Sequence, residues 1–209
     1  MSKPAKRASL VKSNFPLTAP RHDGAISIEK ALHSRRSVRE FAAVPLELWQ
    51  ISQLAWAAQG ITGPDLHRTA PSAGALYPLE LYVATGNVNG LPTGLYKYDF
   101  RDHELRLWAQ GDKRRELYEA ALSQTSILQA AAVFAVSALY KRTTAKYGER
   151  GIRYVHMEAG HAAQNLLLQA VVLGLGSVLV GAFSDEKVRQ VLMLNATESP
   201  LYLIPVGKT

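Results

Sequence analysis

The sequence contains no cysteine among its 209 residues. This absence excludes a disulfide framework, a cysteine nucleophile, thiolate zinc sites and cysteine-ligated iron–sulfur clusters. A reducing, cytoplasmic compartment is the default expectation for such a chain. Long uninterrupted apolar runs are also missing, because the most apolar stretch, residues 166–183, includes Gln169, Ser177 and three glycines. This stretch therefore predicts a buried helix followed by a buried strand, and not a membrane span.

The first twenty residues lack the apolar segment of a secretory signal, and they have no apolar periodicity. We therefore predict a loose basic arm over residues 1–24. The hydrophobic content of 47% suits one sizeable core, so residues 25–209 are expected to form a single domain.

The net charge of +7 is concentrated in three places. Residues 1–21 carry five basic side chains and no acid, and three arginines lie within residues 35–39. Residues 141–153 carry five basic side chains against Glu149 alone. The basicity is thus a tail plus two local clusters, which suits a small anionic ligand such as a phosphate better than a nucleic acid.

Apolar periodicity predicts an α+β fold with a central sheet. Helical spacing predicts helices near residues 28–32, 45–60, 113–122, 153–173 and 185–194. Strand-like runs lie at residues 79–85, 95–98, 104–108, 131–140, 177–183 and 201–206. Helices come first, and strands and helices alternate later, which favours this fold class.

The first candidate binding motif is Arg35-Arg36-Ser37-Val38-Arg39, at the end of the first predicted helix. Three guanidinium groups and a hydroxyl within five residues can bind a phosphate, because the guanidinium fork matches its oxygens. The alternative is a solvated basic helix end that interacts favourably with the helix dipole.

The second candidate is Pro71-Ser72-Ala73-Gly74-Ala75-Leu76-Tyr77-Pro78. Small residues between two prolines allow the backbone to approach a flat ligand, and Ser72 and Tyr77 supply polar groups. The alternative is an ordinary surface turn. Ser72 is not a candidate hydrolase nucleophile, since no Gly-x-Ser-x-Gly motif surrounds it.

The third candidate is the basic segment around Lys146 and Tyr147, which could be a donor pair or a polar rim. The predicted helix that follows contains Gln164 and Asn165 among apolar residues, and such polar groups need partners. A bound ligand or a subunit interface would provide these partners.

Two other kinds of site are rejected. His156 and His161 diverge around a helix, and Glu158 with His161 forms only one Glu-x-x-His pair, so no metal site is expected. Gly174-Leu175-Gly176 follows a helix and precedes a strand, whereas dinucleotide and P-loop motifs need the opposite order.

In their order along the chain, these motifs resemble the nitroreductase superfamily, and most closely its SagB-type dehydrogenase branch. The resemblance covers residues 27–207, with further landmarks at residues 94–98, 153–154 and 158–165. It implies an FMN-dependent oxidoreductase. The implied fold is a sandwich in which helices flank a mixed, mainly antiparallel sheet. The domain is completed by homodimerisation, with FMN at the interface.

The resemblance also implies roles for individual residues. Arg35, Ser37 and Arg39, with Arg36 assisting, would hold the FMN phosphate and ribityl chain, and Lys208 would lie close to the phosphate. The flavin would be lined by Pro71, Ser72, Ala73 and Gly74 of the partner subunit and by the backbone N–H groups of Val180, Gly181 and Ala182, and Gln164 is a further candidate. Lys146 and Tyr147 match a catalytic Lys-Tyr pair of azoline-oxidising members.

Two departures from the family pattern leave the substrate open. Ala73 and Gly74 stand where many NAD(P)H nitroreductases have an asparagine, which favours the SagB-type branch. The enzymes of peptide-modification clusters are commonly longer than this chain. Alternatives are therefore an NAD(P)H-dependent nitro or quinone reductase and a non-catalytic flavoprotein subunit of a modification complex.

Overall fold

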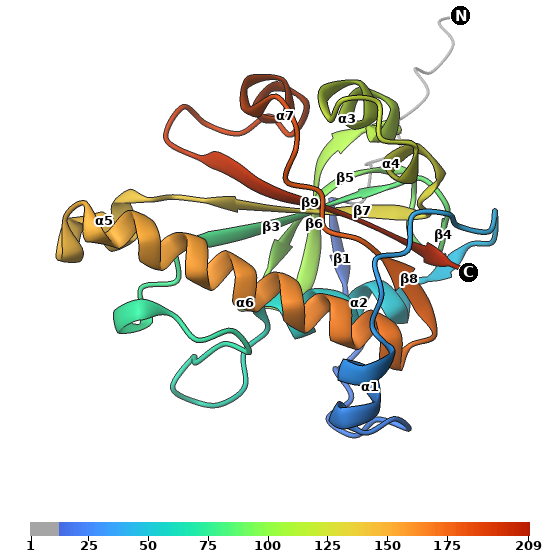
Figure 1. The fold of residues 1–209 in the computed structure, drawn as a ribbon, viewed down its shortest axis with the longest axis horizontal. Helices are drawn as coiled ribbons and strands as arrows, with labels where there is room; N and C mark the ends of the chain where they lie inside the picture. Colours follow the sequence, from blue (N-terminus) through green and yellow to red (C-terminus); the bar gives the residue numbers. More distant parts are fainter. Residues whose placement is uncertain (1–12) are drawn as a thin grey trace, which may run out of the picture.

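A seven-stranded antiparallel sheet in the order β1-β6-β5-β3-β7-β9-β8 forms the centre of residues 13–209, the part of the chain that this computed structural model describes (Figure 1). Its strands are β1 (Asn14–Pro16), β3 (Leu79–Thr85), β5 (Gly94–Asp99), β6 (Glu104–Gln110), β7 (Ala132–Ala138), β8 (Leu175–Ser177) and β9 (Ser199–Lys208). A separate short pair, β2 (Leu46–Glu47) with β4 (Val88–Asn89), is parallel. The predicted α+β fold with a mainly antiparallel sheet is confirmed.

Helices cover both faces of the sheet (Figure 1). One layer contains α1 (Ile28–Ser34), α2 (Leu48–Gln59), α5 (Lys141–Tyr147) and the long α6 (Arg150–Val172). The other layer contains α3 (Arg114–Ala120), α4 (Thr125–Gln129) and α7 (Asp185–Val191). A 3₁₀ turn, η1 (Ala73–Ala75), lies in the loop before β3.

The central strands are buried on both faces because their side chains alternate between two cores. In β3, Leu81 and Val83 pack towards α2 and α6, whereas Tyr82 and Ala84 pack towards α3 and α7. The same alternation holds in β7, where Phe134 belongs to the first core. Successive strand residues point to opposite faces, so a nearly continuous apolar run is what a strand between two helical layers requires.

Several boundaries differ from the sequence predictions. The second helix begins at Leu48 and not at Pro45, because Leu46 and Glu47 pair with β4. The predicted strand at residues 177–183 is wrong in position: β8 ends at Ser177, and only Val180 pairs again, with Leu203 of β9.

The predicted loose arm is wrong for its second half. Residues 1–12 lie outside the described part of the chain, but Asn14–Pro16 form the edge strand β1 against β6. The backbone N–H of Arg21 then donates to Gln53 on α2, at 2.8 Å. No helix in residues 13–209 has the length and hydropathy that crossing a membrane requires.

Candidate active site

The arginine motif lies beside the C-terminal end of the chain. The backbone N–H of Val38 donates to the carbonyl of Ser177 at the end of β8 (3.0 Å), and Ala42 N–H donates to the carbonyl of Lys208 (2.8 Å). The short Ser27-capped helix α1 ends at Ser34, so the motif runs on in extended form along β8 and β9. The fold thus places Lys208 next to residues 35–42, although the two are far apart in sequence.

The cations of the arginine motif and Lys208 have no carboxylate partner among the described residues. In the described part of the chain, no ion pair involves Arg35, Arg36, Arg39 or Lys208. Arg36 does donate through Nη1 to the carbonyls of His33 (2.9 Å) and Arg35 (2.8 Å), so the helix-end alternative describes Arg36 itself. The other three cations remain available for an anion.

The Pro-Ser-Ala-Gly loop meets the Lys146–Tyr147 pair. Gly74 has a φ of +64°, and a Cβ at this position would lie 2.7 Å from Tyr147 Oη and 3.1 Å from Lys146 Nζ. Only glycine combines this left-handed backbone with such a close approach. Ser72 Oγ accepts a hydrogen bond from the backbone N–H of Tyr77 (2.9 Å), which folds the loop back on itself.

The Lys146–Tyr147 pair packs against an aromatic ring of α6. The Tyr147 ring packs edge-to-face on Tyr154 of α6, with centroids 5.2 Å apart. Lys146 Nζ lies 5.3 Å from the centroid of the Tyr147 ring. Helix α5 ends at Tyr147 and is followed by Gly148, which has a φ of +56°, and α6 begins at Arg150. The pair therefore lies at the corner where α5 turns into α6.

Beneath the loop lies a buried acid, Glu158, which the sequence analysis considered only as a metal ligand. Glu158 is only 2% exposed, and its burial raises its pKa to about 7, against the opposing effects of the Ser72 hydroxyl and the Arg68 guanidinium. Burial lowers the pKa of Arg68 to about 10, and its Nη1 donates to Gln59 Oε1 at 2.6 Å. Among the described residues, Glu158 Oε1 and Arg68 Nε have no hydrogen-bond partner.

A signal for Glu158 was present in the sequence. Val155, Glu158, Ala159 and Ala162 follow helical spacing, and all four are buried on one face of α6. A carboxyl group within an apolar stripe is costly unless it is neutral or partnered. Its position in the stripe could have marked Glu158 as a buried acid.

Glu158 should make stability depend on pH. A carboxyl group whose pKa is raised on folding, here from 4.5 to about 7, favours the folded state at low pH and loses this contribution as pH rises through that interval. Glu158→Gln cannot ionise, so we expect it to become more stable than the parent by roughly 2 kcal/mol as pH rises from 4.5 to 7. Urea denaturation across this range measures the difference, with exposed Glu116→Gln as the control. Equal pH slopes in Glu158→Gln and the parent would show that folding does not raise the pKa of Glu158 above its ordinary value of 4.5.

Two further predictions need correction. Val180 N–H donates to the carbonyl of Leu203 (2.8 Å), so it is not free to face a flavin as expected, whereas Gly181 and Ala182 are exposed. Asn165 finds one partner within the chain, because its Nδ2 donates to the carbonyl of Thr69 (3.2 Å), so a ligand or subunit interface is not its sole source of partners as expected. Gln164 lies partly exposed on α6, and its role stays a prediction.

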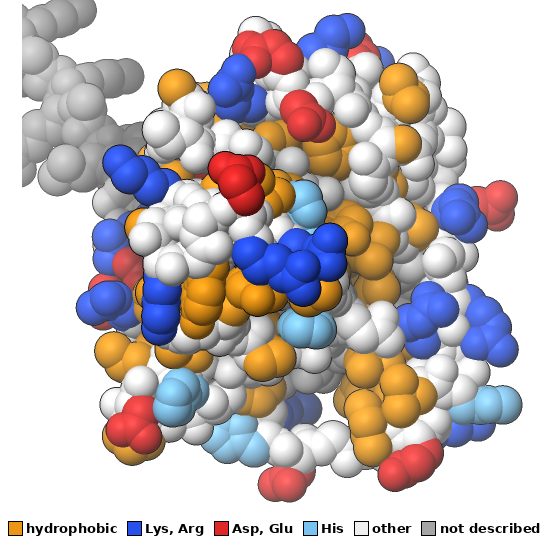
Figure 2. All heavy atoms as spheres, turned by 60° about the vertical axis from the view of Figure 1, so that its left-hand side comes forward, with side chains coloured by type: hydrophobic (Ala, Val, Ile, Leu, Met, Phe, Trp, Pro, Cys, Tyr) orange, Lys and Arg blue, Asp and Glu red, His pale blue; other side chains and the backbone are white. Residues whose placement is uncertain are grey.

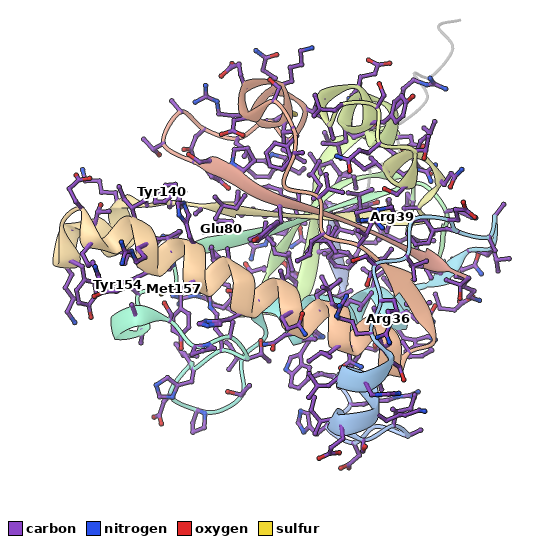
Figure 3. All side chains as sticks on the ribbon, in the orientation of Figure 1. Arg36, Arg39, Glu80, Tyr140, Tyr154 and Met157 are labelled. Atoms are coloured by element: carbon purple, nitrogen blue, oxygen red, sulfur yellow. The ribbon has the colours of Figure 1, made fainter. Side chains whose placement is uncertain are left out.

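The arginine motif of residues 35–39 and the Lys146–Tyr147 pair lie at opposite ends of α6. The pair of α5 lies at its N-terminal end, whereas α1 packs near its C-terminal end, around a hollow of about 500 Å³ that Ile28, Leu168 and Val172 help to line. A helix of 23 residues is about 34 Å long. Figure 3 shows Arg36 and Arg39 at one end of the molecule and Tyr154 at the other. One chain therefore does not bring the two groups together.

Comparisons with known proteins agree with this fold. A family model described as the nitroreductase family matches residues 32–208. A protein of Methanocaldococcus jannaschii named as a nitroreductase, MJ1384, is 47% identical over 88% of this chain and 91% of its own. The trifolitoxin operon protein TfxC of Rhizobium leguminosarum bv. trifolii is 26% identical over 99% of this chain, which spans 61% of TfxC.

Among solved structures, a protein of Ralstonia eutropha JMP134 that is described as a nitroreductase superposes with a TM-score of 0.84 and 29% identity, over 95% of this chain and 90% of its own. Fold and comparisons together define the class: this is an α+β oxidoreductase. More particularly, the chain belongs to the nitroreductase family, whose members are generally flavin-dependent.

Proposed function

We propose that this protein is an FMN-dependent oxidoreductase of the SagB-type branch, which transfers two electrons between a small organic substrate and bound flavin. One observation carries the proposal most directly: Lys146 Nζ and Tyr147 Oη converge on Gly74 of the Pro-Ser-Ala-Gly loop. Two groups that can hold or donate a proton thus lie against the loop that is expected to line the flavin.

The residues present fit FMN. Arg35, Arg39 and Lys208 lie near one another without carboxylate partners in the described ion pairs, as a phosphate site requires. Ser37 is exposed within the same motif and adds a hydroxyl. Pro71, Ser72, Ala73 and Gly74 would line the ring, with Gly181 and Ala182. When bound, FMN supplies the two-electron chemistry that no side chain of this protein can.

The separation of the two groups along α6 favours a homodimer. The phosphate-binding cations of one subunit would have to meet the Pro71–Gly74 loop of its partner, because about 34 Å of helix separates them within one chain. A dimer with two-fold symmetry would form this site twice, since each subunit contributes its cations to one site and its Pro71–Gly74 loop to the other. Relatives of this fold are often dimeric with flavin.

At the reacting end, Lys146 would hold or move the proton and Tyr147 would orient the substrate. The Tyr147 hydroxyl lies against Gly74, and its ring is held edge-to-face by Tyr154. A tyrosine hydroxyl can both donate and accept a hydrogen bond, which suits an orienting role. The exposed Lys146 ammonium can reach a substrate that lies on the loop.

Two alternatives have some support. The 47% identity to MJ1384, which is named as a nitroreductase, favours a nitroreductase activity, with NAD(P)H as the electron donor to test first. The likeness to TfxC favours a subunit of a modification complex, catalytic or not. Rapid bleaching of the flavin by NAD(P)H under anaerobic conditions would favour the reductase.

Sedimentation of the purified protein, followed at the visible absorption band of flavin, tests cofactor and assembly together. We expect a yellow dimer, with an interface that buries more than ~2,000 Å² as obligate dimers do. A colourless protein that takes up no added FMN would contradict both enzyme assignments. A flavin-loaded monomer at micromolar concentration would contradict the shared site.

A further inference from the structure

Four cations around the Lys146–Tyr147 corner have no carboxylate partner. Within the described residues, no ion pair includes Lys141, Lys146, Arg150 or Arg153. Their neighbour Arg142 differs, since it pairs with Glu80 at 2.6 Å. Figure 2, in which the α5 end comes forward, shows Lys and Arg side chains beside hydrophobic surface.

Two of these cations, Arg150 and Arg153, lie at the N-terminal end of α6, where positive charge destabilises a helix. Arg150 is the first residue of α6 and Arg153 closes its first turn, which contains no acid, although the N-cap residue before it is Glu149. The N-terminal end of a helix is the positive end of its dipole, so cations there are unfavourable. By contrast, α1, α3 and α7 all have acidic residues in their first turns. Helix stability therefore does not explain the two arginines.

Side chains, and not the backbone, would attract an anion here. The N–H groups of Gly151 and Ile152 already donate to the carbonyls of Gly148 (2.9 Å) and Glu149 (3.1 Å). The side chains of Arg150 and Arg153 are both exposed. They are thus free to bind an anion from solution.

Two large side chains, Tyr154 and Met157, continue from these arginines along α6. Arg150, Arg153, Tyr154 and Met157 follow the spacing of one helix face, and Tyr154 and Met157 lie about one turn apart on α6 (Figure 3). Met157 is 52% exposed, an unusual exposure for a thioether side chain. The Arg150 guanidinium carbon lies 5.8 Å from the Tyr154 ring centroid. The face thus combines positive charge with a ring and a polarisable sulfur, next to Lys146 and Tyr147.

We propose that this face binds the carboxylate of the substrate, and that the substrate is a small, flat, conjugated acid. Arg150 and Arg153 hold the carboxylate, Tyr154 and Met157 contact the ring, and the reacting part reaches the Lys146–Tyr147 pair. This substrate class rests on the proposed function, since it places the substrate at that site. Because the arginines are exposed, their effect on affinity is modest and weakens with salt.

Para-nitrobenzoate and para-nitrobenzamide, which differ in charge at one group, test the proposal by calorimetric titration of the FMN-incubated dimer. We expect the acid to bind about three- to tenfold more tightly than the amide. The double variant Arg150→Gln/Arg153→Gln should abolish this preference. In turnover with NAD(P)H as the electron donor, it should raise KM for the acid without changing kcat. The control Arg115→Gln/Lys187→Gln removes the same charge from α3 and α7, and it should keep the preference.

Equal binding of acid and amide by the parent, binding of neither, or a preference that survives in the double variant would overturn the proposal. These outcomes differ from a failure of the proposed function. A protein without flavin, or without turnover of either compound, contradicts the oxidoreductase assignment, whereas the calorimetric comparison still reports whether the arginines bind the carboxylate.

Discussion

Substrate oxidation is expected to fall about 10²–10⁴-fold in Lys146→Ala and in Tyr147→Phe, while both variants stay yellow and dimeric. This is the usual effect of losing a positioned acid or base. Tyr147→Phe removes only the hydroxyl that approaches Gly74 and keeps the ring that packs on Tyr154. Lost packing therefore cannot account for such a fall. Steady-state kinetics, with the flavin spectrum of each variant, provide the measurement.

The matched controls are Lys187→Ala on α7 and Tyr118→Phe on α3, both in the opposite helical layer. They should retain the activity of the parent. If Lys146→Ala or Tyr147→Phe loses FMN, the basic segment belongs to the cofactor site. If activity persists in both, the pair is a polar rim, and the reaction needs no protein proton donor.

Weaker FMN binding, on the order of ten- to a hundredfold, is expected for Arg39→Ala. A charge-assisted hydrogen bond contributes roughly 1.5–3 kcal/mol, and ~1.4 kcal/mol corresponds to a tenfold change in affinity. Arg39 is exposed, with no carboxylate partner in the described ion pairs, so little folding stability depends on its charge. Titration of the apoprotein with FMN, followed by quenching of flavin fluorescence, measures the effect.

Riboflavin, which lacks the phosphate, should bind the parent much more weakly than FMN and should bind Arg39→Ala and the parent alike. Arg115→Ala, an exposed arginine on α3, serves as the charge control and should bind FMN normally. Equal affinity of the parent for FMN and riboflavin would show that the arginine motif holds no phosphate.

Local signals predicted much of the secondary structure. Ser27 caps α1 by accepting from Lys30 N–H, and Gly174, with a φ of +67°, follows the end of α6. Strands β5 and β6 also lie where apolar runs predicted strands, at residues 95–98 and 104–108, and they pair as a hairpin. These features depend on residues only a few positions apart, so a single sequence is sufficient to indicate them.

Segments that depend on distant partners were missed or misplaced. Helix α5, with the sequence Lys-Arg-Thr-Thr-Ala-Lys-Tyr, has no apolar periodicity, and only Thr143 is buried when the helix packs on α6. Strand β1 exists through its pairing with β6. The strand predicted over residues 177–183 was misplaced because the register of β9 pairs Leu175 with Lys208 and Ser177 with Val206.

The sequence by itself determined the fold class, most helices and strands, and the family resemblance, because these follow from local periodicity and from the order of motifs. Only the tertiary structure decided which motifs meet. It brought Lys146 and Tyr147 to Gly74, placed Lys208 beside the arginine motif, and buried Glu158 near Arg68. Such contacts depend on sheet register and on how α6 packs, and periodicity within one segment carries no information about either. The length of α6 likewise separates the two groups of candidate residues within one chain, and the homodimer proposed above would bring them together.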